Sequence, residues 1–199
     1  SSINPERQEG PHAHSAIIDP FGSRLLVADL GIDRIVVYQI NPVTGNLIEE
    51  AEASGSAIPG SGPRHLCFHP DGRLLYCIYE LTGFVSVYKY VPGEKLELLH
   101  TVPGLPADFT GVNTAADIHV SAGADYLYTS NRGHDSIAAF DIRNRQIPVL
   151  LGHIHTGGSC PRNFNIVGKF LLAANKDSHN IVEFEIGSDG IPAPTGNEI

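Results

Sequence analysis

The chain has 199 residues, a formal net charge of −9 and 18% charged residues. This acidic balance disfavours nucleic acid as a partner, and no apolar run approaches the roughly 18 residues of a membrane-spanning helix. Trp and Met are absent while Gly (21) and Pro (14) are frequent, which favours short strands joined by tight turns over a helical bundle.

One pattern recurs four times along the chain. Each copy has an apolar run, a turn with glycine, a second apolar run with a polar end, another turn and an alternating run. The four copies are His14–Ile40, Arg64–Tyr90, Ala115–Ile142 and Arg162–Ile186. A repeat of about 50 residues is typical of β-propeller blades. We therefore predict an all-β propeller of four-stranded antiparallel blades, with blades over approximately 11–55, 62–104, 113–157 and 160–199 of a single segment, 1–199.

The turns set the expected strands of the first two copies. In the first copy the expected strands are Ser15–Asp19, Leu25–Leu30, Arg34–Ile40 and Leu47–Ala53. In the second copy they are Arg64–Pro70, Leu74–Glu80, Phe84–Tyr90 and Lys95–Val102. The first two strands are mostly apolar, which indicates cover on both faces by neighbouring blades. Four such blades favour part of a larger ring, so we expect roughly three N-terminal blades to be absent, leaving the C-terminal part of a probable seven.

Polar residues gather at one end of the repeat. In an antiparallel pair the start of the first strand and the end of the second lie at the same edge. The first-strand positions are His14, Arg64, Ala116 and Arg162, and the second-strand positions are Leu30, Glu80, Arg132 and Lys176. In an acidic protein, arginines and a lysine around one opening would concentrate anions, and Arg suits carboxylate or phosphate groups.

Histidine and glutamate add a capacity for proton transfer at this end. His14 has a side chain whose ordinary pKa suits a general base, and His12 is an equal candidate if the strand begins earlier. Glu80 could orient an arginine, accept a proton or bind a hydroxyl. The alternative is that strand ends meet water and carry polar residues for that reason alone.

Other chemistry is less well supported. The three cysteines, Cys67, Cys77 and Cys160, form no disulfide framework and indicate buried thiols in a reducing compartment. His153 and His155 lack a third ligand, so we expect no zinc or other metal site. The sequence contains no phosphate-binding glycine loop and no G-x-S-x-G elbow.

Five ordered motifs carry a family resemblance. They are PHAHS (11–15), DLGIDRI (29–35), GPRHLCFHPDGRLLY (62–76), YLYTSNRGHDSI (126–137) and CPRNFNIVGKFLLAAN (160–175). From about Asn4 onward the chain resembles the seven-bladed lactonase family, which includes bacterial-type 6-phosphogluconolactonases and the fungal carboxymuconate lactonising enzyme. The resemblance implies a seven-bladed propeller that acts on anionic lactones, with His14, Arg64, Glu80 and Arg132 at the channel mouth. The fourth copy departs from the pattern through a shorter first turn, which could alter the register of Arg162.

Our leading hypothesis is a hydrolase of small anionic lactones that needs no cofactor. His14, Arg64, Glu80 and Arg132 are the expected catalytic residues. His12, Arg162 and Lys176 are the expected substrate-binding residues. The alternatives are a cycloisomerase of a carboxymuconate-type substrate and a non-catalytic propeller that binds peptides or acidic ligands. We expect a small lactone as the partner, no nucleic acid, no membrane and a cytoplasmic location, and the sequence leaves the oligomeric state open.

Overall fold

The computed structural model describes residues 3–144 and 147–199, which form seventeen strands. Within these residues no helix is long and apolar enough to cross a membrane. The chain divides into two compact units, Ser1–Thr101 and Val102–Ile199. The all-β prediction is confirmed, and each unit is described on its own below.

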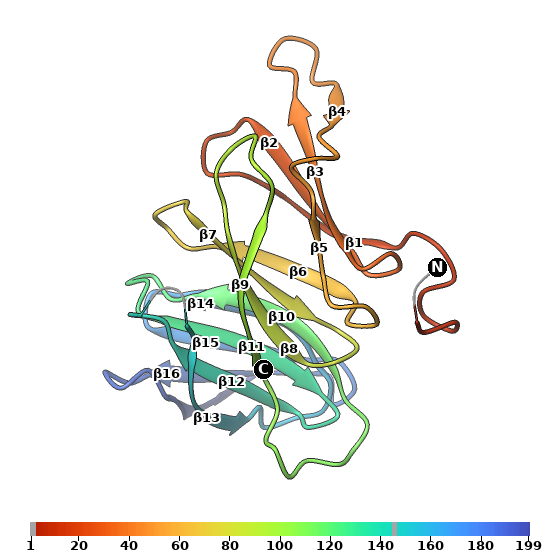
Figure 1. Cartoon of the computed structure of the whole chain (residues 1–199). Coiled ribbons are helices and arrows are strands. Elements are labelled where there is room, and N and C mark those ends of the chain that lie inside the picture. Colours follow the sequence, from red (N-terminus) through yellow and green to blue (C-terminus); the bar gives the residue numbers. More distant parts are fainter. Residues whose placement is uncertain (1–2, 145–146) are drawn as a thin grey trace. The chain divides into compact units, whose positions relative to one another are not determined.

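The first unit begins with an antiparallel sheet in the order β1-β2-β3-β4 (Figure 1). Its strands are β1 (Ala13–Ile18), β2 (Arg24–Asp29), β3 (Arg34–Ile40) and β4 (Leu47–Glu49), with β5 (Gly55–Ser56) also paired to β3. The first three match the expected strands to within two residues.

The expected fourth strand, Leu47–Ala53, is wrong in extent because the chain turns inside it. The amides of Ala53 and Ser54 both donate to the Glu50 carbonyl, at 3.0 and 3.1 Å. Arg24 holds the Glu50 carboxylate at 2.6 Å through Nε, and Ser54 Oγ accepts from the Val37 amide at 3.0 Å. The Ser54 side chain thus accepts the hydrogen bond that a backbone carbonyl of a continuous fourth strand would accept, and the edge is split into β4 and β5.

The second sheet has the order β6-β7-β8-β9. Its strands are β6 (Pro63–Phe68), β7 (Leu74–Tyr79), β8 (Phe84–Lys89) and β9 (Glu97–Pro103). The turn between β6 and β7 is closed by Gly72, whose amide donates to the His69 carbonyl at 2.9 Å and whose φ is 72°. Only glycine adopts that backbone region at no steric cost, so the Pro-Asp-Gly prediction of a tight turn is confirmed.

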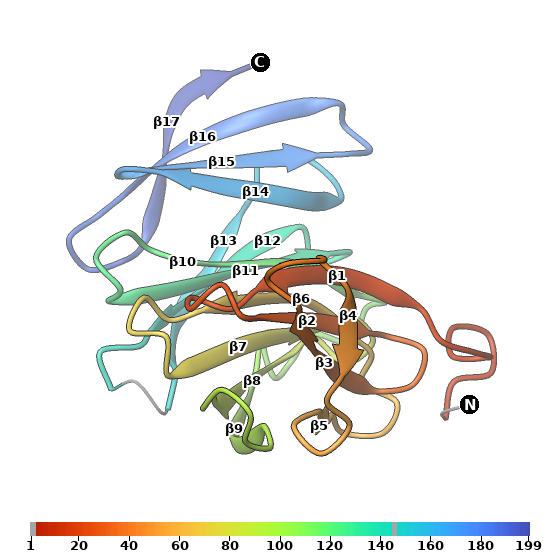
Figure 2. The same ribbon diagram turned by 90° about the horizontal axis from the view of Figure 1, so that it is seen from above.

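The second unit contains two further four-stranded antiparallel sheets. The third sheet is β10 (Thr114–Val120), β11 (Tyr126–Arg132), β12 (Ser136–Asp141) and β13 (Val149–His155). The fourth is β14 (Pro161–Val167), β15 (Phe170–Asn175), β16 (Asn180–Ile186) and β17 (Pro192–Glu198), with β14, β15 and β16 side by side in Figure 2.

In each unit two sheets share one core. The first unit buries Leu26 and Val37 of one sheet with Leu75 and Tyr88 of the next. The second unit likewise packs side chains from β11 and β12 against side chains from β14, β15 and β16. The first strands lie at these junctions, because β1 and β2 contact β6, and β10 and β11 contact β14. This is the blade-on-blade packing expected of a propeller.

Candidate active site

A β-bulge interrupts the first strand of every sheet at the position that the repeat alignment placed at the start of that strand. The register shifts lie between Ala13 and Ser15, Pro63 and His65, Ala115 and Ile118, and Pro161 and Asn163. The residues in the bulges therefore include His14, Arg64, Ala116 and Arg162. A bulge takes a residue out of the hydrogen-bonded ladder and re-aims its side chain, so these positions are structurally equivalent.

The end of the second strand is tied to the segment that leads into each bulge. The Glu80 amide donates to the Gly62 carbonyl at 2.8 Å. The Lys176 amide donates to the Cys160 carbonyl in the same way at 2.9 Å. The backbone therefore brings Glu80 beside Arg64, and Lys176 beside Arg162, as the repeat alignment predicted.

In the first unit this backbone builds a buried ion pair. Arg64 Nε donates to Glu80 Oε2 at 2.7 Å, and the two residues are 2% and 3% exposed. Buried charges of opposite sign with good hydrogen-bond geometry hold one another in place. The pair is a fixed electrostatic feature at the strand end.

His14 lies next to this pair. Its Nε2 atom is 4.0 Å from Glu80 Oε2, and its ring is 5.3 Å from the His65 ring, centroid to centroid. Burial, together with the charges of Arg64 and His65, lowers the pKa of His14 to about 4, although the Glu80 carboxylate acts to raise it. The imidazole is therefore neutral at pH 7 and able to accept a proton.

His12 occupies the same region on the approach to β1. Its amide donates to Asp29 Oδ1 at 2.7 Å, and its Nε2 atom is 2.9 Å from Glu9 Oε1. A pocket of about 150 Å³ lies beside these side chains. It is lined by Glu6, Arg7, Glu9, His12, His14 and Leu30. Both candidate histidines therefore face one pocket.

Two residues that shape this site were not among the predicted site residues. Asp33 accepts from the amides of Gly62 (Oδ1) and Gly60 (Oδ2), both at 2.8 Å, and so fixes the segment that leads to Arg64. Its φ of 52° lies in the left-handed region that Asp tolerates in turns. Arg7 contacts Glu80 Oε1 from outside the repeat altogether.

Arg132 belongs to the second unit. Its guanidinium donates to the carbonyls of Thr114 at 3.2 Å and Ala115 at 2.9 Å, which holds it across β10. Burial and Asp177 raise the pKa of the Cys160 thiol, whereas Arg132 and Lys176 act to lower it, so these cations lie near that thiol. How Arg132 lies relative to the Arg64–Glu80 pair stays a prediction.

Arg162 and Lys176 are exposed, unlike the equivalent pair of the first unit. Lys176 Nζ donates to Asp177 Oδ1 at 2.9 Å, its neighbour in the chain. The equivalent of the Arg64–Glu80 pair is thus two cations that cannot neutralise one another. Their predicted role in substrate binding stays a prediction.

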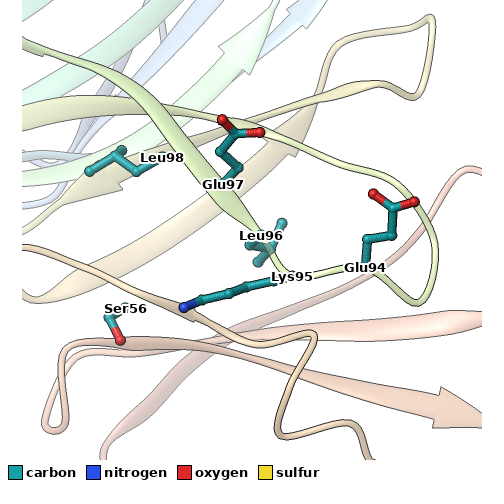
Figure 3. A pocket seen from close by; sticks show the side chains of 6 residues that line it. All are labelled: Ser56, Glu94, Lys95, Leu96, Glu97 and Leu98. Atoms are coloured by element: carbon teal, nitrogen blue, oxygen red, sulfur yellow. The ribbon is translucent and has the colours of Figure 1, made fainter.

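Other features contribute little chemistry. A pocket of about 520 Å³ beside β5 and β9 is lined by Ser56 and residues 94–98, and Figure 3 shows the Lys95 side chain extending toward Ser56. The three cysteines are free, but of the three only Cys77 is buried, so the prediction of buried thiols is wrong for Cys67 and Cys160. His153 Nε2 is 3.1 Å from the Gly104 carbonyl oxygen, and residues 3–144 and 147–199 hold no group of three or more His, Cys, Asp or Glu able to bind a metal ion.

Comparisons with known proteins give a consistent result. Residues 1–199 match the family model "Lactonase, 7-bladed beta-propeller". A 6-phosphogluconolactonase of Yersinia pseudotuberculosis is 37% identical over 180 residues, which cover 88% of this chain and 53% of that protein. One from Bacillus subtilis is 37% identical over 185 residues, or 90% of this chain and 52% of that protein.

Solved structures agree with this similarity. The periplasmic gluconolactonase of Pseudomonas aeruginosa has a TM-score of 0.92 and 32% identity, with 99% of this chain and 56% of that chain covered. The chain thus spans about half the length of the curated relatives that it matches.

Proposed function

Because the chain belongs to the seven-bladed β-propeller lactonase family, we propose that the protein hydrolyses a small anionic lactone at the strand ends that carry His14, Arg64 and Glu80. The relatives named 6-phosphogluconolactonase support a phosphorylated sugar lactone as the substrate class. The chemistry is opening of a cyclic ester by water, for which the described side chains supply a base and fixed positive charge.

The observation that carries the proposal is a neutral histidine beside a buried arginine–carboxylate pair. A general base must be unprotonated before it can act, and a pKa of about 4 leaves His14 in that form at pH 7. Its ring is placed by contact with His65 and by its position in the bulge of β1. The hydrogen bond to Glu80 holds the Arg64 guanidinium in a fixed position, so its positive charge stays at the site.

The proposed reaction has two steps. In the first, His14 takes a proton from water as the water oxygen attacks the lactone carbonyl carbon, and positive charge from Arg64 and Arg132 supports the oxyanion. In the second, the ring carbon–oxygen bond breaks, and the departing ring oxygen takes the proton from the His14 imidazolium. The product is the open hydroxy acid, and His14 is neutral again.

Three further side chains have proposed roles in binding. His12 lies in the same pocket as His14, where it could contact a substrate hydroxyl. Arg162 and Lys176 present exposed positive charge at the equivalent strand end of the second unit, and we propose that this charge contributes to substrate binding.

Turnover of 6-phosphogluconolactone by the intact protein, corrected for spontaneous hydrolysis, tests the proposal. We expect His14→Ala to lower kcat by about 10²–10⁴-fold, the usual contribution of a general base, with a smaller change in KM. His12→Ala is the matched control and should retain most of the turnover. Loss of turnover in His12→Ala alone would move the base to His12. Equal turnover in both variants and the parent would show that neither histidine is the base.

A carboxymuconate supplied in place of the lactone separates the related chemistry. Turnover of the muconate without lactone hydrolysis would establish a cycloisomerase instead.

We further propose that the protein acts in the cytoplasm, which suits three free cysteines. One structural relative is named as periplasmic, so fractionation of cells that express the intact protein is the decisive measurement.

A further inference from the structure

Arg7 reaches the candidate site from the segment that precedes β1. Its Nη2 atom contacts Glu80 Oε1, while Arg64 Nε donates to the other carboxylate oxygen, Oε2. Glu80 therefore bridges two guanidinium groups. The three groups together carry one net positive charge, because one carboxylate neutralises only one of the two arginines.

The local backbone holds Arg7 in this position. Asn4 Oδ1 accepts from the amides of Glu6 and Arg7, each at 3.1 Å, and the Asn4 carbonyl accepts from the Gln8 amide at 2.7 Å. The Gln8 side chain is fully buried, and its Nε2 donates to the Leu30 carbonyl at 2.8 Å. The turn is therefore anchored to the end of β2, and this anchor fixes the position of the Arg7 backbone.

The two arginines differ in access to solvent. The Arg64 side chain is 2% exposed, whereas the Arg7 side chain is 44% exposed and lines the pocket shared with His12 and His14. Glu9, which also lines that pocket, is engaged with His12 at 2.9 Å. Arg7 is thus the cation of the bridged group that a ligand in the pocket can touch.

We propose that Arg7 binds the anionic substituent of the substrate, a carboxylate or phosphate, while Arg64, held by Glu80, keeps the catalytic role proposed above. This inference rests on the proposed lactonase function. It assigns the ground-state contact with the substrate anion to a residue outside the repeat, and leaves Arg64 as fixed charge near the reacting carbonyl. A planar guanidinium suits such a contact because it can donate two parallel hydrogen bonds.

The test compares a charged and a neutral lactone with the intact protein. Arg7→Gln should raise KM for 6-phosphogluconolactone by about 10–100-fold, the usual loss for a hydrogen bond to a charged group, with kcat changed less. KM for glucono-δ-lactone, which lacks the phosphate, should change by less than about threefold. Arg7→Lys should restore part of the affinity, because it keeps the charge but loses the two-pronged geometry.

Arg73→Gln is the matched control. Arg73 is an exposed arginine at the opposite end of the same sheet, so the variant makes the same change of charge away from the site. Its KM for both lactones should equal that of the parent protein. Thermal melting of all three variants separates loss of binding from loss of folding.

Two kinetic outcomes overturn the inference and leave the lactonase proposal standing. One is an unchanged KM of Arg7→Gln for the phosphorylated lactone. The other is an equal rise for both lactones, which would mean that Arg7 only supports the fold of the site.

If the parent protein hydrolyses neither lactone, the proposed function fails, and calorimetric binding of 6-phosphogluconate tests Arg7 separately. If Arg7→Gln binds 6-phosphogluconate at least tenfold more weakly than Arg73→Gln does, the proposal that Arg7 binds an anion is supported. Equal binding, or no binding by the parent, would overturn it.

Discussion

The second and fourth sheets share the same backbone arrangement at the strand end, but the side chains there are buried in the second sheet and exposed in the fourth. Both have a bulge in the first strand, and in both an aspartate of the preceding sheet accepts hydrogen bonds from the segment that leads into the bulge. Asp33 accepts from the amides of Gly60 and Gly62, and Asp135 accepts from the Cys160 amide and the Ser159 hydroxyl. In the second sheet the arginine meets a glutamate and both are buried. In the fourth sheet Arg162 and Lys176 are both cations and both are exposed.

The difference shows that the repeat specifies where a side chain is placed, and that charge pairing decides whether the position becomes a fixed site. Like charges opposite one another repel and gain nothing from burial, so they stay in water. Opposite charges with good geometry hold one another even where water is excluded.

The largest loss of stability should follow removal of the Glu80 charge. Glu80→Gln leaves Arg64 buried beside a neutral amide, and we expect unfolding to become easier by about 3–5 kcal/mol. Urea unfolding measures the loss. The matched change Lys176→Gln, at an exposed position, should alter stability by no more than about 0.5 kcal/mol. Equal effects at the two positions would show that the buried pair is not a distinct feature.

Asp33→Asn tests the scaffold that both sheets share. Asn tolerates the left-handed backbone but offers one acceptor oxygen for two amides, so we expect a loss of about 1–3 kcal/mol. Because Gly62 sets the positions of Arg64 and Glu80, turnover should fall as well. Asp135→Asn should lower the melting temperature comparably and reduce turnover less. A larger loss of turnover in Asp135→Asn would place the reaction nearer the second unit's residues.

The pH dependence of stability tests whether His14 is buried in its neutral form. The pKa of His14 in the folded protein is about 4, below the ordinary value of 6.5. Between these pH values His14 is therefore protonated in the unfolded chain and neutral in the folded protein. Stability should therefore fall as pH drops from 6.5 toward 4, by up to about 1 kcal/mol per pH unit. His14→Gln should show a shallower slope in urea unfolding across this range, and identical slopes would contradict the burial of a neutral imidazole.

The smallest effect should come from Arg162. Arg162→Gln removes an exposed charge, and we expect stability within about 0.5 kcal/mol of the parent. Arg64→Gln, the equivalent change in the second sheet, should be far more damaging because it leaves Glu80 buried. Differential scanning calorimetry of the two variants makes the comparison, and a loss above about 1 kcal/mol in Arg162→Gln would contradict it.

The sequence predicted the parts of the site that follow from the repeat. Aligning the four copies placed His14, Arg64 and Glu80 at one strand end, and the structure gathers these three residues. Periodicity and turn residues were sufficient because strand pairing carries the spacing from one copy to the next.

Two features depend on contacts that no repeat contains. Arg7 meets Glu80 only because Gln8 anchors its turn to Leu30, and Asp33 acts on amides 27 and 29 residues later in the chain. The break between β4 and β5 has a similar origin, since it depends on Ser54 reaching the Val37 amide. Such side-chain contacts leave no periodic pattern, and so they appear only in the structure.

The bulges have a consequence for how this protein can change. Because the extra residue stands outside the ladder, its side chain can be replaced without altering the register of the strands on either side. The four equivalent positions already hold an imidazole at His14, a methyl group at Ala116 and guanidinium groups at Arg64 and Arg162. A substitution at a bulge therefore changes the chemistry at the strand end without shifting the register of the sheet, and its cost depends on whether the side chain that it removes was paired.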